Sequence, residues 1–368
     1  MKYIRMPIEI ESPEQMGYDS IKCNLTESSV RDFYFTDLDI NLNDLMICYG
    51  HHVGHPELRN LIAKEKKGIE KDDVLLTIGA AGALFILQTA ILSSEDHIIV
   101  MRPNYGTNIE TPKAIGCEIS FIDLSFENGF KPNFEEIKAK IKPNTKLISI
   151  TTPHNPTGVS LNIDELQFFI DLAELNQIYL LVDETYSEIP IGKSPLPAAA
   201  SLSKWAISIC SLSKSYGLPG IRLGWLINRD QKLMEKLLAG KEQIYICNSI
   251  VDEEIAYQAM LKKETILSKV RKNLETNFAI LEKWIMEEKN LKFVMPDGGV
   301  VVFPKMNDDI DENKFYEILN NKYATYVGPG HWFEMDRKFF RLGFGWPTPT
   351  ELQDGLLNIS KALEEAKA

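Results

Sequence analysis

The feature that most constrains the fold is a series of short apolar segments in the middle of the chain, separated by helical patterns. A helix with apolar residues on most sides is expected over 82–92, and a second helix before Gly116. Strands that alternate with helices form parallel sheets covered on both faces. The pattern therefore predicts an α/β fold with a mainly parallel seven-stranded sheet, whose last strand runs antiparallel at the edge. The expected strands are 73–78, 97–101, 118–124, 145–151, 178–183, 205–211 and 222–228.

The pattern changes after about Lys241, where a helical region extends to about Lys289. Short apolar segments separated by turns follow, and a closing helix is expected from about Thr350, which together predict a smaller α+β C-terminal domain. A chain of 368 residues is long enough to form two hydrophobic cores. We therefore expect three parts: an N-terminal arm that packs on the small domain and the active site (1–40), a large ligand-binding domain (41–245) and the small domain (246–368).

The charge and the cysteines exclude several classes of partner. The formal net charge is −12, which argues against nucleic acid or an anionic membrane as the main partner. No apolar run approaches the length of a membrane span, and the first residues lack the pattern of a signal peptide. The five cysteines are scattered without a CxxC pair or a Cys/His cluster, so we expect no metal site, no disulfide framework and a cytoplasmic location.

One lysine occupies an unusual position. In the segment SLSKSYGLPGIRLGW, Lys214 follows an apolar run that ends at Cys210. Burial lowers the pKa of an amine, and the neutral amine is the form that condenses with an aldehyde to give a Schiff base. For this residue taken alone, the alternative is a lysine that extends its ammonium from a strand end into water. The neighbouring Ser211, Ser213 and Arg222 favour the first interpretation, because two hydroxyls and a guanidinium suit a phosphate dianion.

A second anion-binding feature is expected in TIGAAGALF, which combines a strand, a tight turn and the start of a helix. The backbone N–H groups of Ala80 and Ala81 lie at this start and can point at an anion, aided by the helix dipole. Close packing of the helix on the strand through small residues is the alternative explanation of the same turn.

Polar and aromatic residues follow three further strands. Asp183 in DETY ends a hydrophobic strand, and a carboxylate in such a place needs a partner. A protonated pyridine nitrogen is such a partner, and the pairing keeps the ring able to accept electrons. Tyr186 and Asn155, the latter in TPHNPTG, can both hydrogen-bond a ring hydroxyl. Tyr105 in RPNYGTN can stack on a flat ring or simply pack in the core.

All of these positions lie at the carboxyl ends of the expected parallel strands, where ligands bind in open α/β sheets. A lysine for an aldehyde, an aspartate for a pyridinium and donors for a phosphate together describe one molecule. The sequence therefore predicts pyridoxal 5′-phosphate (PLP) as the cofactor.

The ordered motifs GAAGAL, NPTG, DETY, SLSKSYGLPGIRLGW and FRLGFG resemble those of the aminotransferase class I/II family of PLP-dependent enzymes, over nearly the whole chain. The resemblance implies the PLP-dependent transferase fold type I. It also implies an aminotransferase that moves an amino group from an L-amino acid to a 2-oxo acid with ping-pong kinetics. Lys214 would form the Schiff base and shuttle the proton, and Asp183 would pair the ring nitrogen. The remaining cofactor residues would be Asn155 and Tyr186 at the ring oxygen, Tyr105 on the ring face, and Ala80, Ala81, Ser211, Ser213 and Arg222 at the phosphate.

The same resemblance assigns three further roles. Arg341 in FRLGF would clamp the α-carboxylate of the substrate, for which a planar guanidinium is suited, and Asn155 would contribute to that site. Tyr49 in YGHHVGHPELR would reach the phosphate of a partner subunit. The enzyme would then be a symmetric homodimer with shared active sites.

Some features leave alternatives open. Ala80 and Ala81 stand where many relatives have a hydroxyl residue. The segments 22–38, 297–305 and 326–333 resemble the capreomycidine synthase branch, whose enzymes eliminate water from a β-hydroxylated arginine and close a ring. The complete DETY motif favours an ordinary aminotransferase over this β-elimination and cyclisation. A non-catalytic PLP-binding regulatory protein is disfavoured, because no DNA-binding domain is recognisable before residue 40 and the charge is acidic.

The substrate side chain is the least constrained feature. Seven residues are candidates for its pocket, each of which can equally be an ordinary core or surface residue: His51, His52, His55, Glu27, Asp32, Trp332 and Glu334. If the substrate resembles arginine, an acidic group such as Glu27 or Asp32 should face its guanidinium.

Overall fold

The computed structural model describes residues 1–17 and 21–367, and its largest element is a seven-stranded sheet. The strand order is β2-β8-β7-β6-β5-β3-β4, and six of the seven strands are parallel to one another. This confirms the predicted α/β class. The strands are β2 (Val74–Ile78), β3 (His97–Arg102), β4 (Glu118–Asp123), β5 (Thr145–Thr151), β6 (Tyr179–Asp183), β7 (Ala206–Ser211) and β8 (Leu223–Ile227).

The expectation that the last strand lies at the edge of the sheet is wrong. β8 is antiparallel, as predicted, but it lies between β2 and β7, and the edges are β2 and β4. All five residues of β8 are buried. Buried backbone N–H and C=O groups need partners, so a strand buried along its whole length pairs on both of its sides.

Helices cover both faces of the sheet because alternate residues of each strand point to opposite sides. Leu75 of β2 packs with the helices of one face, whereas its neighbours Val74 and Leu76 pack in the cluster on the other face. The first face carries α4 (Gly79–Ile91), α5 (Thr107–Ile115) and α9 (Gln231–Ile244). The second carries α3 (Pro56–Lys64), α6 (Phe134–Ala139), α7 (Ile163–Asn176), α8 (Ala199–Leu202) and α10 (Ile250–Leu261).

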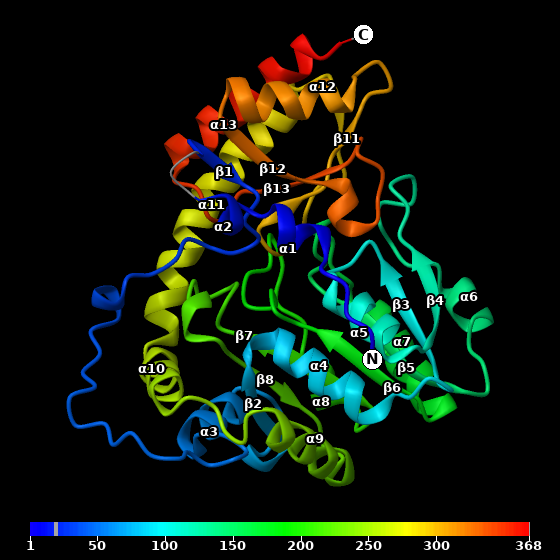
Figure 1. The fold of residues 1–368 in the computed structure, drawn as a ribbon, viewed down its shortest axis with the longest axis vertical. Coiled ribbons are helices and arrows are strands. Elements are labelled where there is room, and N and C mark those ends of the chain that lie inside the picture. Colours follow the sequence, from blue (N-terminus) through cyan, green and yellow to red (C-terminus); the bar gives the residue numbers. More distant parts are fainter. Residues whose placement is uncertain (18–20, 368) are drawn as a thin grey trace.

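The small domain lies above the large domain in Figure 1 and has its own core. Its four-stranded sheet has the order β1-β12-β13-β10, and β1 is contributed by the N-terminal segment, parallel to β12. The strands are β1 (Cys23–Leu25), β10 (Val301–Val302), β12 (Thr325–Pro329) and β13 (Phe340–Gly343), with a separate pair β9 (Leu291–Lys292) and β11 (Lys305–Met306). The helices are α11 (Lys263–Glu287), α12 (Glu312–Glu317) and α13 (Pro349–Glu365). This confirms the predicted smaller α+β domain.

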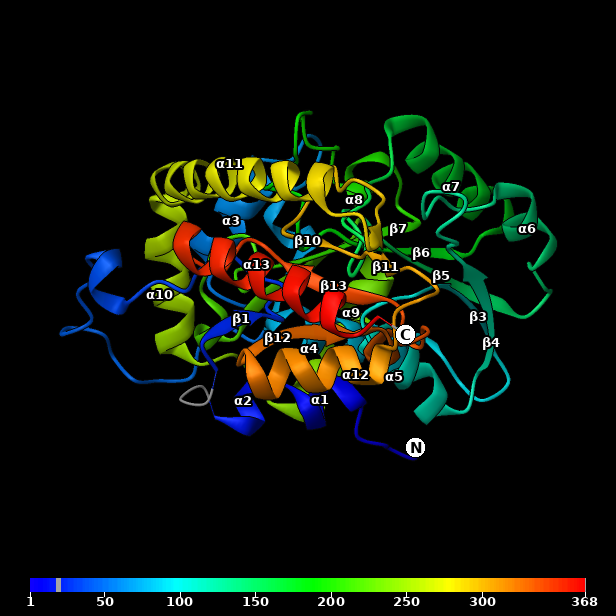
Figure 2. The ribbon, with the colours of Figure 1, turned by 90° about the horizontal axis from the view of Figure 1, so that it is seen from above.

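The N-terminal residues form two short helices, α1 (Pro7–Glu11) and α2 (Pro13–Met16), which lie between the two domains (Figures 1 and 2). The carboxylate of Glu11 accepts hydrogen bonds from His331 Nε2 (2.7 Å) and Trp332 Nε1 (2.8 Å). These two bonds tie α1 to the 3₁₀ turn Gly330–Phe333 of the small domain.

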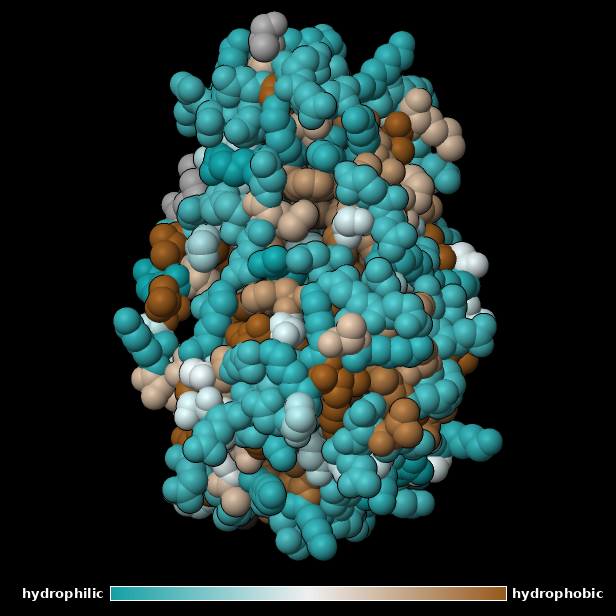
Figure 3. Space-filling view, turned by 90° about the vertical axis from the view of Figure 1, so that its right-hand side faces the viewer, coloured by the Kyte–Doolittle hydropathy of each residue, from teal (hydrophilic) through white to brown (hydrophobic). Residues whose placement is uncertain are grey.

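Within residues 1–17 and 21–367, no helix is both long enough and apolar enough to cross a membrane. Figure 3 shows the side of the molecule that is on the right in Figure 1. Its upper part, the small domain, is mostly hydrophilic, and apolar residues lie mainly in the middle and lower parts.

Candidate active site

A cavity of about 220 Å³ opens at the carboxyl ends of the parallel strands, between the large domain, the small domain and the N-terminal helices. Its wall brings together nearly all of the residues that the sequence predicted for the site. These are Ala80, Ala81, Tyr105, Asn155, Asp183, Tyr186, Ser211, Ser213, Lys214, Arg222 and Arg341.

Lys214 lies three residues after the end of β7, and its side chain faces this cavity. Its backbone oxygen accepts a hydrogen bond from Val30 N (3.0 Å), which links the lysine loop to the N-terminal segment. Burial lowers the pKa of the Lys214 amine, and the carboxylate of Glu27 opposes this effect. No hydrogen-bond acceptor within the described chain contacts Nζ, so the amine is free to react with an aldehyde.

Asp183 ends β6 at the floor of the cavity and is 6% exposed. Its Oδ1 accepts hydrogen bonds from the backbone N (3.1 Å) and the Oγ1 (2.5 Å) of Thr185. Its Oδ2 has no donor among the described residues. Burial raises the pKa of this carboxyl, and the Thr185 hydrogen bonds oppose the rise. A buried carboxylate with one free oxygen requires a cation, and the nitrogen of a pyridinium ring is a suitable one.

The start of α4 forms an anion cradle. The helix has 13 residues and no side-chain cap, so its first N–H groups are free to bind an anion. Arg222 lies against this turn: a Cβ atom on Gly79 (φ +64°) would come within 2.7 Å of Arg222 Nη2. The guanidinium is positioned by its hydrogen bonds to Pro219 O (2.8 Å) and Ser213 Oγ (3.4 Å). A helix N-terminus, a guanidinium and nearby hydroxyls together suit a phosphate dianion.

Tyr105 follows β3 and forms one side of the cavity. The turn that carries it is fixed by Asn104, whose Oδ1 accepts from Tyr105 N (2.8 Å), Asn108 Nδ2 (3.2 Å) and Thr151 Oγ1 (3.2 Å). Burial raises the pKa of the Tyr105 hydroxyl, so the ring is neutral at physiological pH and can stack on a flat cofactor.

Tyr186 is 4% exposed, and its hydroxyl donates a hydrogen bond to Ser28 O (2.7 Å). Burial raises its pKa to about 12. The single hydroxyl proton is therefore directed at the N-terminal segment, and the oxygen retains its ability to accept a hydrogen bond from a cavity ligand. The role of Tyr186 at a ring oxygen stays a prediction.

Arg341 in β13 is 4% exposed and supplies a positive charge to the cavity. Nη1 donates to Asn155 Oδ1 (3.0 Å), Nη2 donates to Thr26 O (2.7 Å), and the guanidinium lies 4.9 Å from the centre of the Phe333 ring. Its Nε is buried without a partner, and burial lowers the pKa of the group. A buried guanidinium that contacts only neutral acceptors is a binding group for an anion such as a carboxylate.

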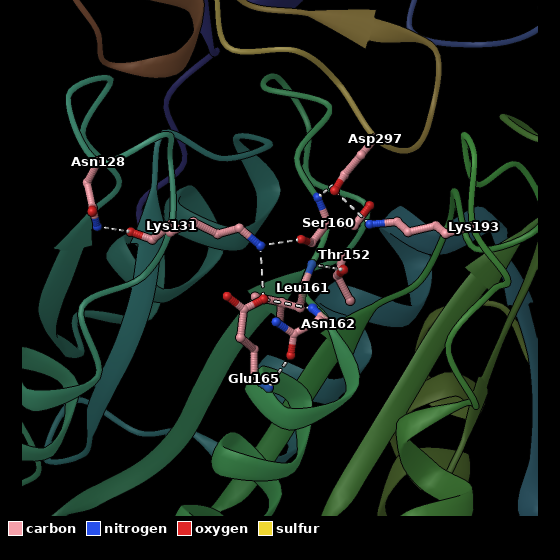
Figure 4. Close-up of polar contacts among 9 residues, drawn as sticks. All are labelled: Asn128, Lys131, Thr152, Ser160, Leu161, Asn162, Glu165, Lys193 and Asp297. Atoms are coloured by element: carbon pink, nitrogen blue, oxygen red, sulfur yellow. Dashed lines mark hydrogen bonds and ion pairs between the residues drawn. The ribbon is translucent and has the colours of Figure 1, made fainter.

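The loop that carries Asn155 is held against the small domain (Figure 4). Asp297 accepts hydrogen bonds from Ser160 N (2.6 Å) and from Lys193 Nζ (2.7 Å). On the other side of the loop, Lys131 Nζ donates to Ser160 O (2.7 Å) and to Glu165 (2.9 Å). The loop that carries Asn155 is therefore bound to the small domain through Asp297, and Asn155 itself is bound to it through Arg341.

Several residues that were candidates for the substrate pocket do not line this cavity. Asp32 lies outside the cavity, where its carboxylate accepts a hydrogen bond from Trp346 Nε1 (2.9 Å). His52 pairs with Glu242, and His55 stacks on Tyr257. Among the seven candidates, Glu27 and Trp332 line the cavity, and His51, His52, His55, Asp32 and Glu334 do not.

The sequence placed the N-terminal arm at the active site, but it named neither the two helices of this arm nor the residues of theirs that line the cavity. Their lining residues are Ile8, Glu9, Ser12, Pro13 and Glu14. The available signal was a proline at the first position of each helix, Pro7 and Pro13, which is typical of helix starts. Tyr49 lies outside this chain's cavity and is 82% exposed, in a loop that extends from the body at the left of Figure 1.

Comparison with known proteins identifies the class. The family model of aminotransferase class I and II matches residues 38–356, and the chain therefore belongs to this family. It is 27% identical to capreomycidine synthase of Streptomyces vinaceus, over 94% of this chain and 91% of that one. It is also 27% identical to an aspartate aminotransferase of Pyrococcus horikoshii, over 87% and 84% of the two chains. A crystal structure of a PLP-dependent aminotransferase from Streptococcus suis matches with a TM-score of 0.93 and 28% identity, covering 100% of both chains.

These comparisons give PLP as the cofactor, as the sequence predicted. The residues of the cavity fit it on two observations. The uncapped start of α4 and Arg222 form a cradle that a side chain at Gly79 would fill. The free Oδ2 of Asp183 provides a buried negative charge, and the amine of Lys214 faces the same space. The ring nitrogen, the aldehyde and the phosphate of PLP each have a group of matching chemistry.

Proposed function

We propose that the protein is a PLP-dependent aminotransferase that moves an amino group from an L-amino acid to a 2-oxo acid with ping-pong kinetics. The observation that carries the proposal is that the unpartnered amine of Lys214 and the buried guanidinium of Arg341 face one cavity, together with Asp183. Transfer of an amino group from an amino acid requires two such groups: an amine that moves protons and a separate binding group for the carboxylate.

The residues have distinct tasks in this reaction. When bound, PLP supplies the aldehyde that takes up the amino group and the ring that accepts electrons from Cα. Arg341 holds the substrate carboxylate, and its bond to Asn155 fixes the plane of the guanidinium. Lys214 Nζ would remove the proton from Cα and deliver it on the other side of the transferred nitrogen, two atoms away from Cα. Asp183 keeps a proton on the ring nitrogen, and the N-terminal helices limit the access of water.

We further propose a homodimer in which Tyr49 reaches the phosphate of the partner subunit. Apolar side chains around this tyrosine support the proposal: Met46 is 76% exposed and Ile47 is 74% exposed. Contact with a second subunit would remove these side chains from water.

A second candidate function is β-elimination of a hydroxyl followed by cyclisation. It is favoured by the similarity to capreomycidine synthase and by Glu27, a carboxyl in the same cavity as Lys214 whose pKa is raised by burial. In its protonated form, a carboxyl can give its proton to a departing β-hydroxyl as the Cβ–O bond breaks, so that the hydroxyl leaves as water.

A single-turnover experiment separates the two functions. The holoenzyme is mixed with each amino acid of a wide panel, without any oxo acid, and the cofactor and products are analysed. Pyridoxamine phosphate with one equivalent of a 2-oxo acid is the result expected of an aminotransferase. Many turnovers of a dehydrated or cyclised product, with the cofactor still at the aldehyde level, would contradict it and establish the elimination. The Lys214→Ala protein is the control and should do neither.

A further inference from the structure

The charged side chains that line the cavity do not balance once the cofactor and an amino acid are assigned to their groups. Four carboxylates and three cations line it: Glu9, Glu14, Glu27 and Asp183, and Lys214, Arg222 and Arg341. The phosphate would pair with Arg222, and the ring nitrogen would pair with Asp183. The substrate carboxylate would pair with Arg341, and Lys214 must be a neutral amine to act as the base that removes the Cα proton. The three glutamates are then left without a cation in the described lining.

Glu27 is the innermost of these three glutamates. It follows β1, and its Oε1 accepts a hydrogen bond from Asn24 Nδ2 (3.3 Å). The Oδ1 of Asn24 is held in turn by the backbone N (3.0 Å) and the Oγ1 (2.7 Å) of Thr26, so the turn that carries Glu27 is rigid. Oε2 has no donor among the described residues. The carboxylate is close enough to Lys214 and Arg341 for their charges to lower its pKa against the effect of burial.

Arg341, which lines the same cavity, points independently to a ligand. Arg341 is 4% exposed, its Nε has no partner, and it contacts only neutral acceptors, so it requires an anion. Glu14 lies at the mouth of the cavity, where its side chain is exposed and has no ion-pair partner within the described chain. A ligand held by Arg341 therefore shares the cavity with the carboxylates of Glu27 and Glu14.

We propose that the substrate is an amino acid with a cationic side chain, whose positive group is bound by Glu27 inside the cavity and by Glu14 at its mouth. This proposal rests on the amino-acid chemistry proposed above. A neutral side chain would leave the Glu27 carboxylate without a cation, and an acidic one would be repelled by it.

The carboxylates of Glu27 and Glu14 also limit which oxo acid can accept the amino group. A dicarboxylic oxo acid would place one carboxylate on Arg341 and the second against Glu27 and Glu14. No further cation in the described lining is free to compensate that second charge. The accepting oxo acid is therefore a monocarboxylate, and pyruvate should be a better acceptor than 2-oxoglutarate.

Binding of unreactive probes tests the proposal without depending on turnover. The probes are 5-guanidinopentanoate and octanoate, which have similar lengths, share the carboxylate and lack an amine that could react with the cofactor. Calorimetry on the holoenzyme should give at least tenfold tighter binding of the guanidino compound. In Glu27→Gln that preference should fall to within about threefold, and in Glu14→Gln it should fall less. Asp32→Asn, a carboxylate outside the cavity, is the matched control and should keep the full preference.

Equal binding of the two probes to the native holoenzyme would overturn the proposal. A preference for the guanidino compound that survives in Glu27→Gln would overturn the role of Glu27. Equal weakening of the binding of both probes in Glu27→Gln would also overturn that role, because Glu27 would then be only a counter-ion of Lys214. Single turnovers with lysine and with its neutral analogue norleucine then test the proposed function separately. Failure of every amino acid to form an oxo acid, together with an intact probe preference, would refute transamination but not the cationic site.

Discussion

Replacing Arg341 by lysine keeps a positive charge in the cavity but removes the planar fork. In the native chain, Nη1 and Nη2 are fixed by Asn155 Oδ1 (3.0 Å) and Thr26 O (2.7 Å), which sets the plane of the guanidinium. An ammonium is a point charge without two parallel N–H groups, so it binds a carboxylate in a less defined orientation. The Cα–H bond of the substrate is then no longer held in position for Lys214.

The size of the effect follows from the burial of the group. Arg341 is 4% exposed, so its bond to a carboxylate is a buried, charge-assisted pair. Disrupting such a pair costs about 2–5 kcal/mol. Since 1.4 kcal/mol corresponds to about tenfold, and since lysine retains part of the attraction, Arg341→Lys should fall at the lower end of this range and lower kcat/KM by about 30-fold.

The assay compares kcat/KM for the best amino acid with that for its α-carboxamide, which lacks the negative charge. The native enzyme should prefer the acid strongly, and Arg341→Lys should lose most of this preference. Arg271→Lys is the matched control, because Arg271 pairs with Glu264 on the surface, and it should behave as the native enzyme. An unchanged preference in a well-folded Arg341→Lys protein would refute the assignment of Arg341 to the carboxylate.

Three further changes probe other parts of the site. Asp183→Asn removes the charge that faces the ring nitrogen. The rate constant of a single turnover should fall by roughly 100-fold or more, since loss of one partner of a buried ion pair costs about 3–5 kcal/mol. A loss of less than about threefold would exclude the pairing. Glu184, whose pKa is raised to about 7 by burial from an ordinary 4.5, stabilises the folded state while protonated, and this contribution is lost as the pH rises from about 4.5 through 7. Glu184→Gln should therefore gain stability relative to the native chain between pH 5 and pH 8 in urea unfolding, and a constant difference would contradict this. Glu11→Gln weakens the bonds to His331 and Trp332, so limited proteolysis should cut within residues 1–17 faster and KM should rise more than kcat changes; an equally resistant N-terminus would refute its role in holding α1.

The positions of the cofactor residues could be predicted from the sequence because each one follows a recognisable apolar strand. Asp183 ends β6 and Lys214 follows β7, and parallel strands bring their carboxyl ends to one edge of the sheet whatever the strand order is. The strand order itself depends on pairing between distant segments. β8 is adjacent to β2, about 150 residues earlier in the chain, and no local pattern encodes that contact.

The substrate side of the cavity could not be located for a related reason. Glu27 enters the cavity because β1 pairs with β12 of the small domain, about 300 residues further along the chain. The helices α1 and α2 have five and four residues, too few to give a helical periodicity. Asp32 and Glu27 therefore looked equivalent in the sequence, and the fold separates them.

The most direct test of the account is to identify the lysine that bonds to the cofactor. Lys241 is the strongest rival, because it is fully buried and its pKa is lowered to about 8, but its Nζ donates to Leu76 O (2.9 Å) and it does not line the cavity. The holoenzyme is reduced with borohydride, digested and analysed by mass spectrometry. One phosphopyridoxyl group per chain is expected, on the peptide that contains Lys214. The same group on Lys241 or on any other lysine would contradict it.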